Sequence, residues 1–409
     1  MTVIAKADSP ARSGLGLLVA GKFASTVAYS ILWVLLPLYV YRSSGSALAA
    51  ALASAVNVLP FLLFGLFAGA VVDRSSPTRV MVWMETANAA VLLCVPLLAG
   101  TVGTHPAALI LVGFASATVY VWFEVASSAA IPAVVGKDGV FRANSYLWMA
   151  GTVVTSVAAP VGFFLLDALR LGPTFAVLAG FYLLSAVLIA LLRLPDAAAP
   201  EPGRARERGA VWAGLRFIGG QPLLRAYTIV NVGVGISAGA VYGMLVVFAS
   251  RALGLPTDDY RTAWIMTACG AGALLGALAA RRLKTAPPVP AARWLIGADL
   301  VLLLAYAAAP NWAVALAALL CWNTVHTCFM VVGISVRQVI TPLHLQGRVN
   351  AVGRMIAWGS VPLGTLLCGW LTEALGPRQA LALLAVCALA GLVVALRTPR
   401  TLTLEEAAR

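Results

Sequence analysis

RANSYLWMAGTVVTSVAAPVGFFLLDAL at residues 142–169 and RVNAVGRMIAWGSVPLGTLLCGWLTEAL at residues 348–375 are related by a constant offset of 206 residues. The first stretch has Asp167 where the second has Glu373. A polar Arg-x-Asn at the same offset is harder to attribute to chance than identities between apolar residues, so we infer an internal duplication. The identical positions are Arg142, Asn144, Met149, Leu165, Ala168 and Leu169, which recur as Arg348, Asn350, Met355, Leu371, Ala374 and Leu375.

The composition indicates that the duplicated chain lies in a membrane. Of its 409 residues 61% are hydrophobic and only 11% are charged, whereas a soluble domain carries about 25% charged residues. A surface that faces lipid needs no such charge. The net charge of +13 is scattered between apolar runs. It therefore indicates the basic bias of cytoplasmic membrane loops, and no nucleic-acid partner is expected.

Twelve apolar runs are long enough to cross a bilayer, which takes about 20 residues each. Six are expected near residues 15–40, 46–72, 80–100, 107–133, 144–168 and 173–194, and six near residues 226–249, 262–280, 294–309, 312–336, 351–374 and 379–396. The sequence therefore predicts an all-α polytopic membrane protein of twelve transmembrane helices in two pseudo-symmetric six-helix bundles. The expected domains are an N-terminal tail (1–14), a first bundle (15–194), a linker (195–222), a second bundle (223–397) and a C-terminal tail (398–409).

The lysines and arginines set the expected orientation. With the N-terminus in the cytoplasm, five of the 28 lysines and arginines fall in outer connections. The other 23 fall on the cytoplasmic side or at that end of a span, as the positive-inside rule requires. Both termini are then cytoplasmic, in the inner or plasma membrane. Six spans per half make the repeat parallel, which places a substrate cavity between the halves near the midplane. The five basic residues of the outer connections are Arg42, Arg170, Arg251, Arg261 and Arg378.

The connection after the second span reads GLFAGAVVDRSSPTR at residues 65–79. Gly65 and Gly69 lie four residues apart, which lets two helices approach closely. Asp73 at the membrane surface can pair with a helix N-terminus or an arginine and hold one closed state; simple anchoring of the helix end is the alternative. With Arg74 and Arg79, the segment resembles the loop 2–3 signature of the major facilitator superfamily, although Ser-Pro replaces the usual Gly-Arg at residues 76–77. Its counterpart in the second half, residues 276–282, lacks the acid.

Further stretches resemble one branch of that superfamily, the macrolide-efflux and enterobactin-exporter-like permeases. The resemblance covers nearly the whole chain and implies efflux of an amphipathic small molecule, an antibiotic, drug or secondary metabolite, driven by proton antiport. A monomer in the lipid bilayer is expected to suffice. The resembling stretches are LPLYVY at 36–41, GSAL at 45–48, AIPA at 130–133, RAN at 142–144, GLRF at 214–217, PLLR at 222–225, GRVNA at 347–351 and WGSVPLG at 358–364.

A bend is expected in the fifth span, where residues 159–162 read Ala-Pro-Val-Gly. This is a partial match to the Gly-Pro-x-x-Gly element of drug–proton antiporters in the same superfamily. Pro160 and Gly162 permit a membrane helix to bend. An ordinary kink without a coupling role is the alternative.

Ionisable residues inside spans are the best candidates for function because each is costly in hydrocarbon. Glu124 lies well inside the fourth span and is interpreted as a proton or substrate site, with a structural hydrogen-bonding role as the alternative. Asp299 is a second candidate carboxylate. Lys22 either extends to the cytoplasmic surface or contacts substrate, and for Glu85 we expect a structural pair with basic loop residues. Four further polar residues that can line a cavity are Asn231, Asn323, His326 and Arg354.

Other function classes find less support in the sequence. A siderophore exporter of the same family is the first alternative, and it makes Lys22 and Arg354 the discriminating residues. A non-transporting receptor or assembly factor is a second, although the outer loops are short. We expect no enzyme activity, metal or cofactor, since no nucleophile–base pair or metal cluster is recognisable. Gly16-x-x-x-x-Gly21-Lys22 matches most of a phosphate loop but has Phe23 where Ser or Thr would hold magnesium.

Overall fold

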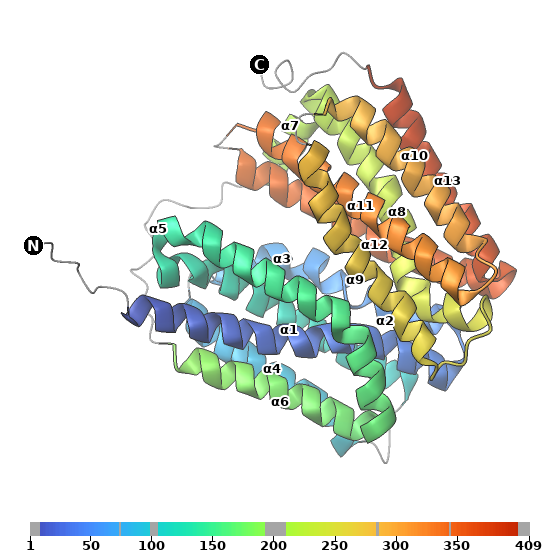
Figure 1. Ribbon diagram of the computed structural model, residues 1–409. Helices are drawn as coiled ribbons and strands as arrows, with labels where there is room; N and C mark the ends of the chain where they lie inside the picture. Colours follow the sequence, from blue (N-terminus) through green and yellow to red (C-terminus); the bar gives the residue numbers. More distant parts are fainter. Residues whose placement is uncertain are drawn as a thin grey trace, which may run out of the picture. The chain divides into compact units, whose positions relative to one another are not determined.

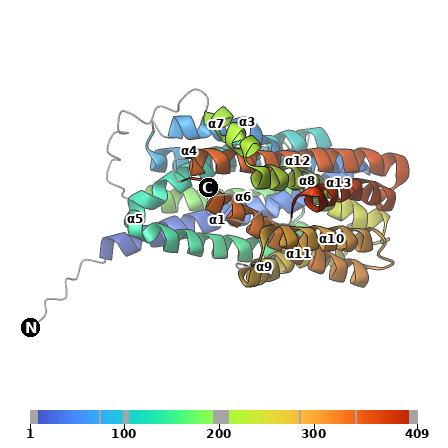
Figure 2. The same cartoon turned by 90° about the horizontal axis from the view of Figure 1, so that it is seen from above.

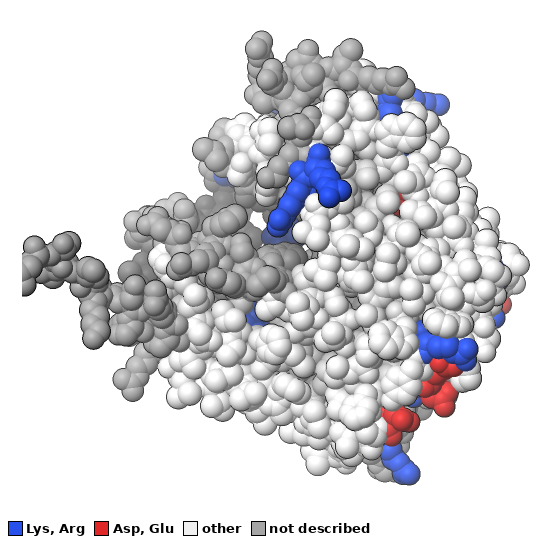
Figure 3. All heavy atoms as spheres, in the orientation of Figure 1, with Lys and Arg blue, Asp and Glu red and all other residues white. Residues whose placement is uncertain are grey.

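The computed structural model describes residues 9–72, 75–98, 105–192, 210–283, 286–342 and 345–399, and over these residues the protein is built from helices (Figure 1). Within the described residues, twelve helical segments are long and apolar enough to cross a membrane. On the face drawn in Figure 3, uncharged side chains cover most of the described surface. The expected fold class is confirmed.

Residues 1–36 and 60–205 form the first of two compact units. The first 36 residues include most of α1 (Ser9–Ser44), and the unit continues with α3 (Leu59–Val72), α4 (Pro77–Leu97), α5 (Pro106–Leu169) and α6 (Leu171–Ala190). Within α5 the backbone leaves helical geometry at Gly136, with φ 68° and ψ 169°, which divides it into the fourth and fifth spans. Gly136 is the one residue inside α5 with non-helical dihedrals, so the helix continues through Pro160 and Gly162. A Cβ on Gly162 would lie 3.3 Å from the Leu35 side chain, so this glycine lets α5 pack closely on α1.

Residues 37–59 and 206–409 form the second unit. It contains α2 (Ala47–Ala55), α7 (Ala210–Gly220), α8 (Pro222–Arg251), α9 (Tyr260–Ala280), α10 (Pro288–Ala307), α11 (Trp312–Ile340), α12 (Gln346–Leu375) and α13 (Pro377–Arg397), with a short 3-10 turn at Arg281–Leu283 after α9. Figure 2 shows α9, α10 and α11 lying side by side, and α12 beside α8 and α13. Residues 37–59 come from the first half of the sequence, yet α2 packs against α8 and α12.

Two segments differ locally from what hydropathy indicates. The second span is not one continuous helix, because residues 56–58 form a turn between α2 and α3. The expected linker contains α7, which packs on α8 and α12. Gly214 permits this contact, since a Cβ there would lie 2.9 Å from the carbonyl oxygen of Arg348. α7 is an amphipathic helix inside a polar linker, so hydropathy alone does not predict it.

Local sequence accounts for several helix starts. Side-chain oxygens accept hydrogen bonds from the first free backbone N–H groups at Ser46 for α2, Asp259 for α9 and Asn311 for α11. Proline occupies the first turn of α4, α5, α8, α10 and α13, where its missing N–H costs no helical hydrogen bond. These signals fix where the spans begin after each short connection.

A line of glycines joins α8 to α12. Gly235, Gly239 and Gly243 recur every four residues, and a Cβ on Gly239 would lie 2.0 Å from the carbonyl oxygen of Val361. The Thr365 hydroxyl donates to the Gly239 carbonyl over 2.7 Å. Small residues at this spacing allow two backbones to touch, which supplies the packing that lipid cannot drive by a hydrophobic effect.

Candidate functional site

An intramembrane ion pair lies in the first unit between α1 and α5. The Lys22 Nζ is 3.0 Å from Glu124 Oε1 and donates to Ser127 Oγ over 2.9 Å. The Lys22 side chain is 15% exposed and that of Glu124 36%. Lys22 therefore turns toward Glu124, and its expected extension to the cytoplasmic surface is not observed. Placing a cation against a carboxylate lowers the cost of having both in a membrane.

Aromatic rings lie next to this pair. The rings of Tyr29 and Tyr120 stack with centroids 3.7 Å apart and planes 3° from parallel. Trp33 meets Tyr29 edge-on at 5.8 Å, and Phe123 lies 6.0 Å from Tyr120. Because Tyr120 precedes Glu124 by one helical turn, the stack and the carboxylate share a face of α5. Apolar rings beside a charge are a suitable wall for an amphipathic molecule.

A second polar cluster lies in the other unit, between α10 and α11. The Asp299 Oδ1 is 3.3 Å from His326 Nδ1, and both side chains are buried, at 2% and 8% exposure. The ring of Trp322 stacks on His326 with centroids 4.9 Å apart. One turn away, the Asn323 amide donates to the Cys269 carbonyl and accepts from the Tyr242 hydroxyl. Three predicted residues, Asp299, His326 and Asn323, are thus brought together.

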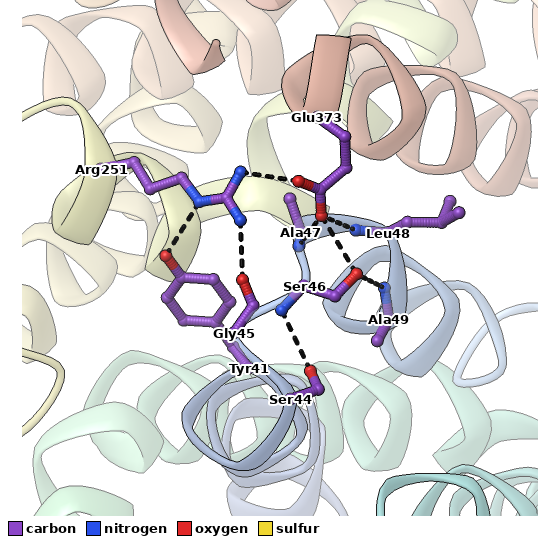
Figure 4. A network of polar contacts seen from close by, with 9 residues as sticks. All are labelled: Tyr41, Ser44, Gly45, Ser46, Ala47, Leu48, Ala49, Arg251 and Glu373. Atoms are coloured by element: carbon purple, nitrogen blue, oxygen red, sulfur yellow. Dashed lines mark hydrogen bonds and ion pairs between the residues drawn. The ribbon is translucent and has the colours of Figure 1, made fainter.

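A third network joins α2 to α8 and α12 within the second unit (Figure 4). The Glu373 carboxylate lies at the N-terminus of α2, where Oε1 accepts from Ser46 Oγ at 3.0 Å and from the backbone N–H groups of Ala47 at 2.5 Å and Leu48 at 3.3 Å. Its other oxygen is 2.9 Å from Arg251 Nη1.

The same arginine binds the end of α1. Arg251 donates to the Gly45 carbonyl at 2.7 Å and to the Tyr41 hydroxyl at 3.2 Å. Glu373 and Arg251 together therefore hold residues 41–48 to α8 and α12. The orientation expected from the lysines and arginines would put this end of the helices on the outer side of the membrane.

The remaining predicted residues are dispersed. Asn231 is buried in α8, and its Oδ1 has no hydrogen-bond partner among the described residues. Arg354 lies exposed near the start of α12, and Arg79 lies exposed in the first turn of α4. A Cβ on Gly65 would meet nothing within 4 Å. Gly69 lies within α3, and Asp73 and Arg74 are outside the described residues, so the loop latch stays a prediction.

The sequence interpretation missed two carboxylates. It noted Glu373 only as the repeat partner of Asp167, because the helix start that this acid caps lies 326 residues away in the sequence. It expected Glu85 to pair with basic loop residues. Among the described residues Glu85 instead accepts a hydrogen bond from Ser25 at 2.8 Å, and it is fully buried. No group of three or more His, Cys, Asp or Glu side chains in the described part of the chain is placed to hold a metal ion.

Comparison with known proteins places these clusters in context. The family model described as Major Facilitator Superfamily matches residues 18–365. A multidrug efflux pump, Tap of Mycolicibacterium fortuitum, is 27% identical over 97% of this chain and 98% of its own length. Two solved structures share the fold. One is a bacterial homologue of the human lysosomal transporter Spinster in an inward-facing, occupied conformation, which is 14% identical, covers 97% of this chain and 98% of its own, and has a TM-score of 0.76. The other is the nucleoside transporter NupG, which is 14% identical, covers 93% of this chain and 98% of its own, and has a TM-score of 0.74.

Proposed function

Because the chain belongs to the Major Facilitator Superfamily, we propose that it is a secondary active efflux transporter that exports an amphipathic small molecule in exchange for protons. The observation that carries this proposal is the Lys22–Glu124 ion pair beside the stacked Tyr29 and Tyr120 rings. The likeness to a multidrug efflux pump over 97% of the chain supports the direction of transport and the broad substrate class. The family of transporters also argues against an enzyme.

Glu124 is the proposed coupling group. Its Oε1 faces Lys22, while its Oε2 has no hydrogen-bond partner among the described residues. A proton on this carboxyl cancels its charge and removes the attraction to Lys22. The Lys22 ammonium is then free to move, and the surface formed by Tyr120 and Glu124 loses its negative charge. A transporter can exploit this change only if the two protonation states favour different conformations.

Asp299 and His326 are proposed as a second proton-sensitive pair. Both are buried, and their mutual attraction depends on a proton on the imidazole and none on the carboxyl. The Trp322 ring stacked on His326 places an aromatic surface beside the pair, as Tyr120 does beside Glu124.

The network at Glu373 and Arg251 is proposed as the closed outer gate. Alternating access requires the two sequence halves to rock, and residues 41–48 of the first half are held to α8 and α12 of the second by hydrogen bonds that can break and re-form. We place both termini in the cytoplasm and treat the monomer as the functional unit.

A siderophore exporter is less well supported by the same contacts. An anionic catecholate needs an uncompensated cation in its path, whereas Lys22 is already paired with Glu124. Arg354 is exposed, and in the sequence it lies apart from the other predicted cavity residues. The proposal for an amphipathic substrate therefore stands ahead of it.

The test is transport in sealed inverted vesicles with ethidium as a fluorescent probe. An imposed pH gradient should drive ethidium accumulation by the wild-type protein, and Glu124→Gln should abolish it while the variant still inserts and elutes as a single species. Asp167→Asn, which changes an exposed carboxylate outside the three clusters, is the matched control and should transport normally. Unimpaired transport by Glu124→Gln would remove Glu124 from the mechanism.

A further inference from the structure

Glu85 is a membrane-embedded carboxyl group without a cation. It lies in the middle of α4 with 0% of its surface exposed. Its Oε1 accepts a hydrogen bond from Ser25 of α1 at 2.8 Å, and its Oε2 has no hydrogen-bond partner among the described residues. No basic nitrogen of the described chain is recorded within ion-pair distance of it. The two carboxyl groups of this unit's interior therefore differ: Glu124 is neutralised by Lys22, and Glu85 is not.

Every helix around Glu85 presents a polar but uncharged group. From α6, Tyr182 and Ser185 face the carboxyl with buried hydroxyl groups. On the α4–α5 side, Asn88 and Ser116 bond each other at 2.6 Å. From α1, Ser25 supplies the hydroxyl described above. The titratable groups near this cluster are Tyr182 and, further along α1, Lys22 and Tyr29.

These surroundings suit a neutral acid and not a carboxylate. An isolated ionised carboxyl in an apolar interior is so costly that it takes up a proton instead. Once protonated, the group carries no charge and has one O–H donor, which the hydroxyl oxygens around it can accept. Full burial without a cation among the described residues, and not the hydroxyl groups around it, is what favours the neutral form of Glu85.

Helix α1 connects this acid to the ion pair. Lys22 faces Glu124, and Ser25, three residues later, faces Glu85. Residues three apart on a helix lie about 5–6 Å apart at their Cβ atoms, which is within the reach of a lysine side chain. The cluster formed by Lys22, Glu124 and Glu85 thus holds one cation and two carboxyl groups, and it is neutral when it holds one proton.

We propose that Glu85 and Glu124 share a single proton, and that Lys22 pairs with whichever of the two is ionised. The structure has the ion pair at Glu124, and the proposal assigns the proton to Glu85 in this arrangement. When the proton leaves Glu85 and one binds Glu124, the ammonium moves to the Glu85 carboxylate, and the net charge of the interior does not change. Because Glu124 is 36% exposed and Glu85 is buried, Glu124 is the group that exchanges protons with the outside and Glu85 the group that stores one. The role of this proton in transport rests on the antiport proposed above; its location does not.

The experiment is infrared difference spectroscopy of the reconstituted full-length protein at neutral pH without any transport substrate. The carbonyl stretch of a protonated carboxyl group reports how many acids hold a proton. Glu85→Gln should remove the band of one acid. Glu124→Gln should remove the same amount, because Lys22 is then free to ionise Glu85. Lys22→Met should add the band of one acid, since both carboxyls are then neutral.

Asp167→Asn is the control for the assignment. Asp167 is an exposed acid outside this buried cluster, so this carboxyl-to-amide change should leave the band unaltered. An unchanged band in Glu85→Gln would overturn the proposal. A loss in Glu85→Gln without a loss in Glu124→Gln would show a static proton on Glu85 and overturn the sharing. Failure of vesicle transport by the wild-type protein would refute the antiport but leave these spectra interpretable.

Discussion

Removing the Glu373 carboxylate is the sharpest test of the outer gate. Glu373→Ala deletes three hydrogen bonds to the start of α2 and one ion pair with Arg251. The variant should loosen residues 41–48 from α8 and α12 without altering either polar cluster in the membrane. Glu373→Gln, which keeps one acceptor oxygen but loses the charge, should give a smaller effect in the same direction.

The contacts set the size of the effect. A side chain that caps a helix N-terminus contributes about 0.5–2 kcal/mol, and an ion pair as exposed as this one, at 30% and 38%, adds about 0–1 kcal/mol. These contributions sum to about 0.5–3 kcal/mol, and from the middle of that range we expect Glu373→Ala to destabilise the closed gate by about 1.5–2 kcal/mol. Since 1.4 kcal/mol is a tenfold change in an equilibrium constant, the open population should rise roughly ten- to thirtyfold.

Labelling of a cysteine at Ser54 measures that population. Ser54 lies in α2, is part-buried, and its hydroxyl donates to the Gly243 carbonyl of α8 over 3.1 Å, so opening of the gate should expose it further. In a background without the six native cysteines, Ser54→Cys should react with a membrane-impermeant maleimide in right-side-out vesicles. The rate should rise roughly ten- to thirtyfold when Glu373→Ala is added.

The internal repeat provides a matched control. Asp167 occupies the position equivalent to Glu373 and is exposed, so Asp167→Ala should leave the rate unchanged. Equal rates for Glu373→Ala and the parent would refute the reasoning that this network closes the gate. Labelling from the opposite side of the membrane alone would refute the expected orientation.

Two further predictions concern packing and the second cluster. Gly239→Val places a side chain 2.0 Å from the backbone oxygen of Val361. It should therefore lower the free energy of unfolding by about 3 kcal/mol, at the upper end for overpacking, and lower the melting temperature in detergent. The control Gly65→Ala, whose added Cβ meets nothing within 4 Å, should melt like the wild type. For Asp299 and His326, a double-mutant cycle of the two alanine variants should give a coupling of about 0.5–3 kcal/mol in stability; additive losses would show that the 3.3 Å contact contributes nothing.

The sequence was sufficient for the spans because hydropathy reports directly on the bilayer. A run of about 20 apolar residues has few alternatives to a membrane helix, and expected spans such as 379–396 lie within one turn of the observed helix, Pro377–Arg397. Hydropathy carries no information on breaks inside an apolar run. The turn at residues 56–58 is therefore invisible to it, and so is the helix Ala210–Gly220 inside a polar linker.

Pairing of the site residues was harder to foresee, because it depends on which helices are neighbours. Glu124 and Asp299 stand out in the sequence as costly intramembrane acids, but their partners Lys22 and His326 are 102 and 27 residues away. Lys22 alone is compatible with an extended side chain that reaches the surface. Only the placement of α1 beside α5 decides that it turns inward.

The duplication explains why a symmetric sequence yields an asymmetric gate. Asp167 and Glu373 occupy equivalent positions at the same end of equivalent helices, α5 and α12. Among the described residues, however, only Glu373 meets a helix start and an arginine. The difference lies in the neighbours: residues 45–48 begin α2 directly beside Glu373, whereas Asp167 is exposed. An acid that caps another helix can be released by moving that helix, while an exposed acid has no contact to break. Among the described residues the repeat keeps an acid at both positions but a partner at only one of them, and this supports the proposed gate at the second copy.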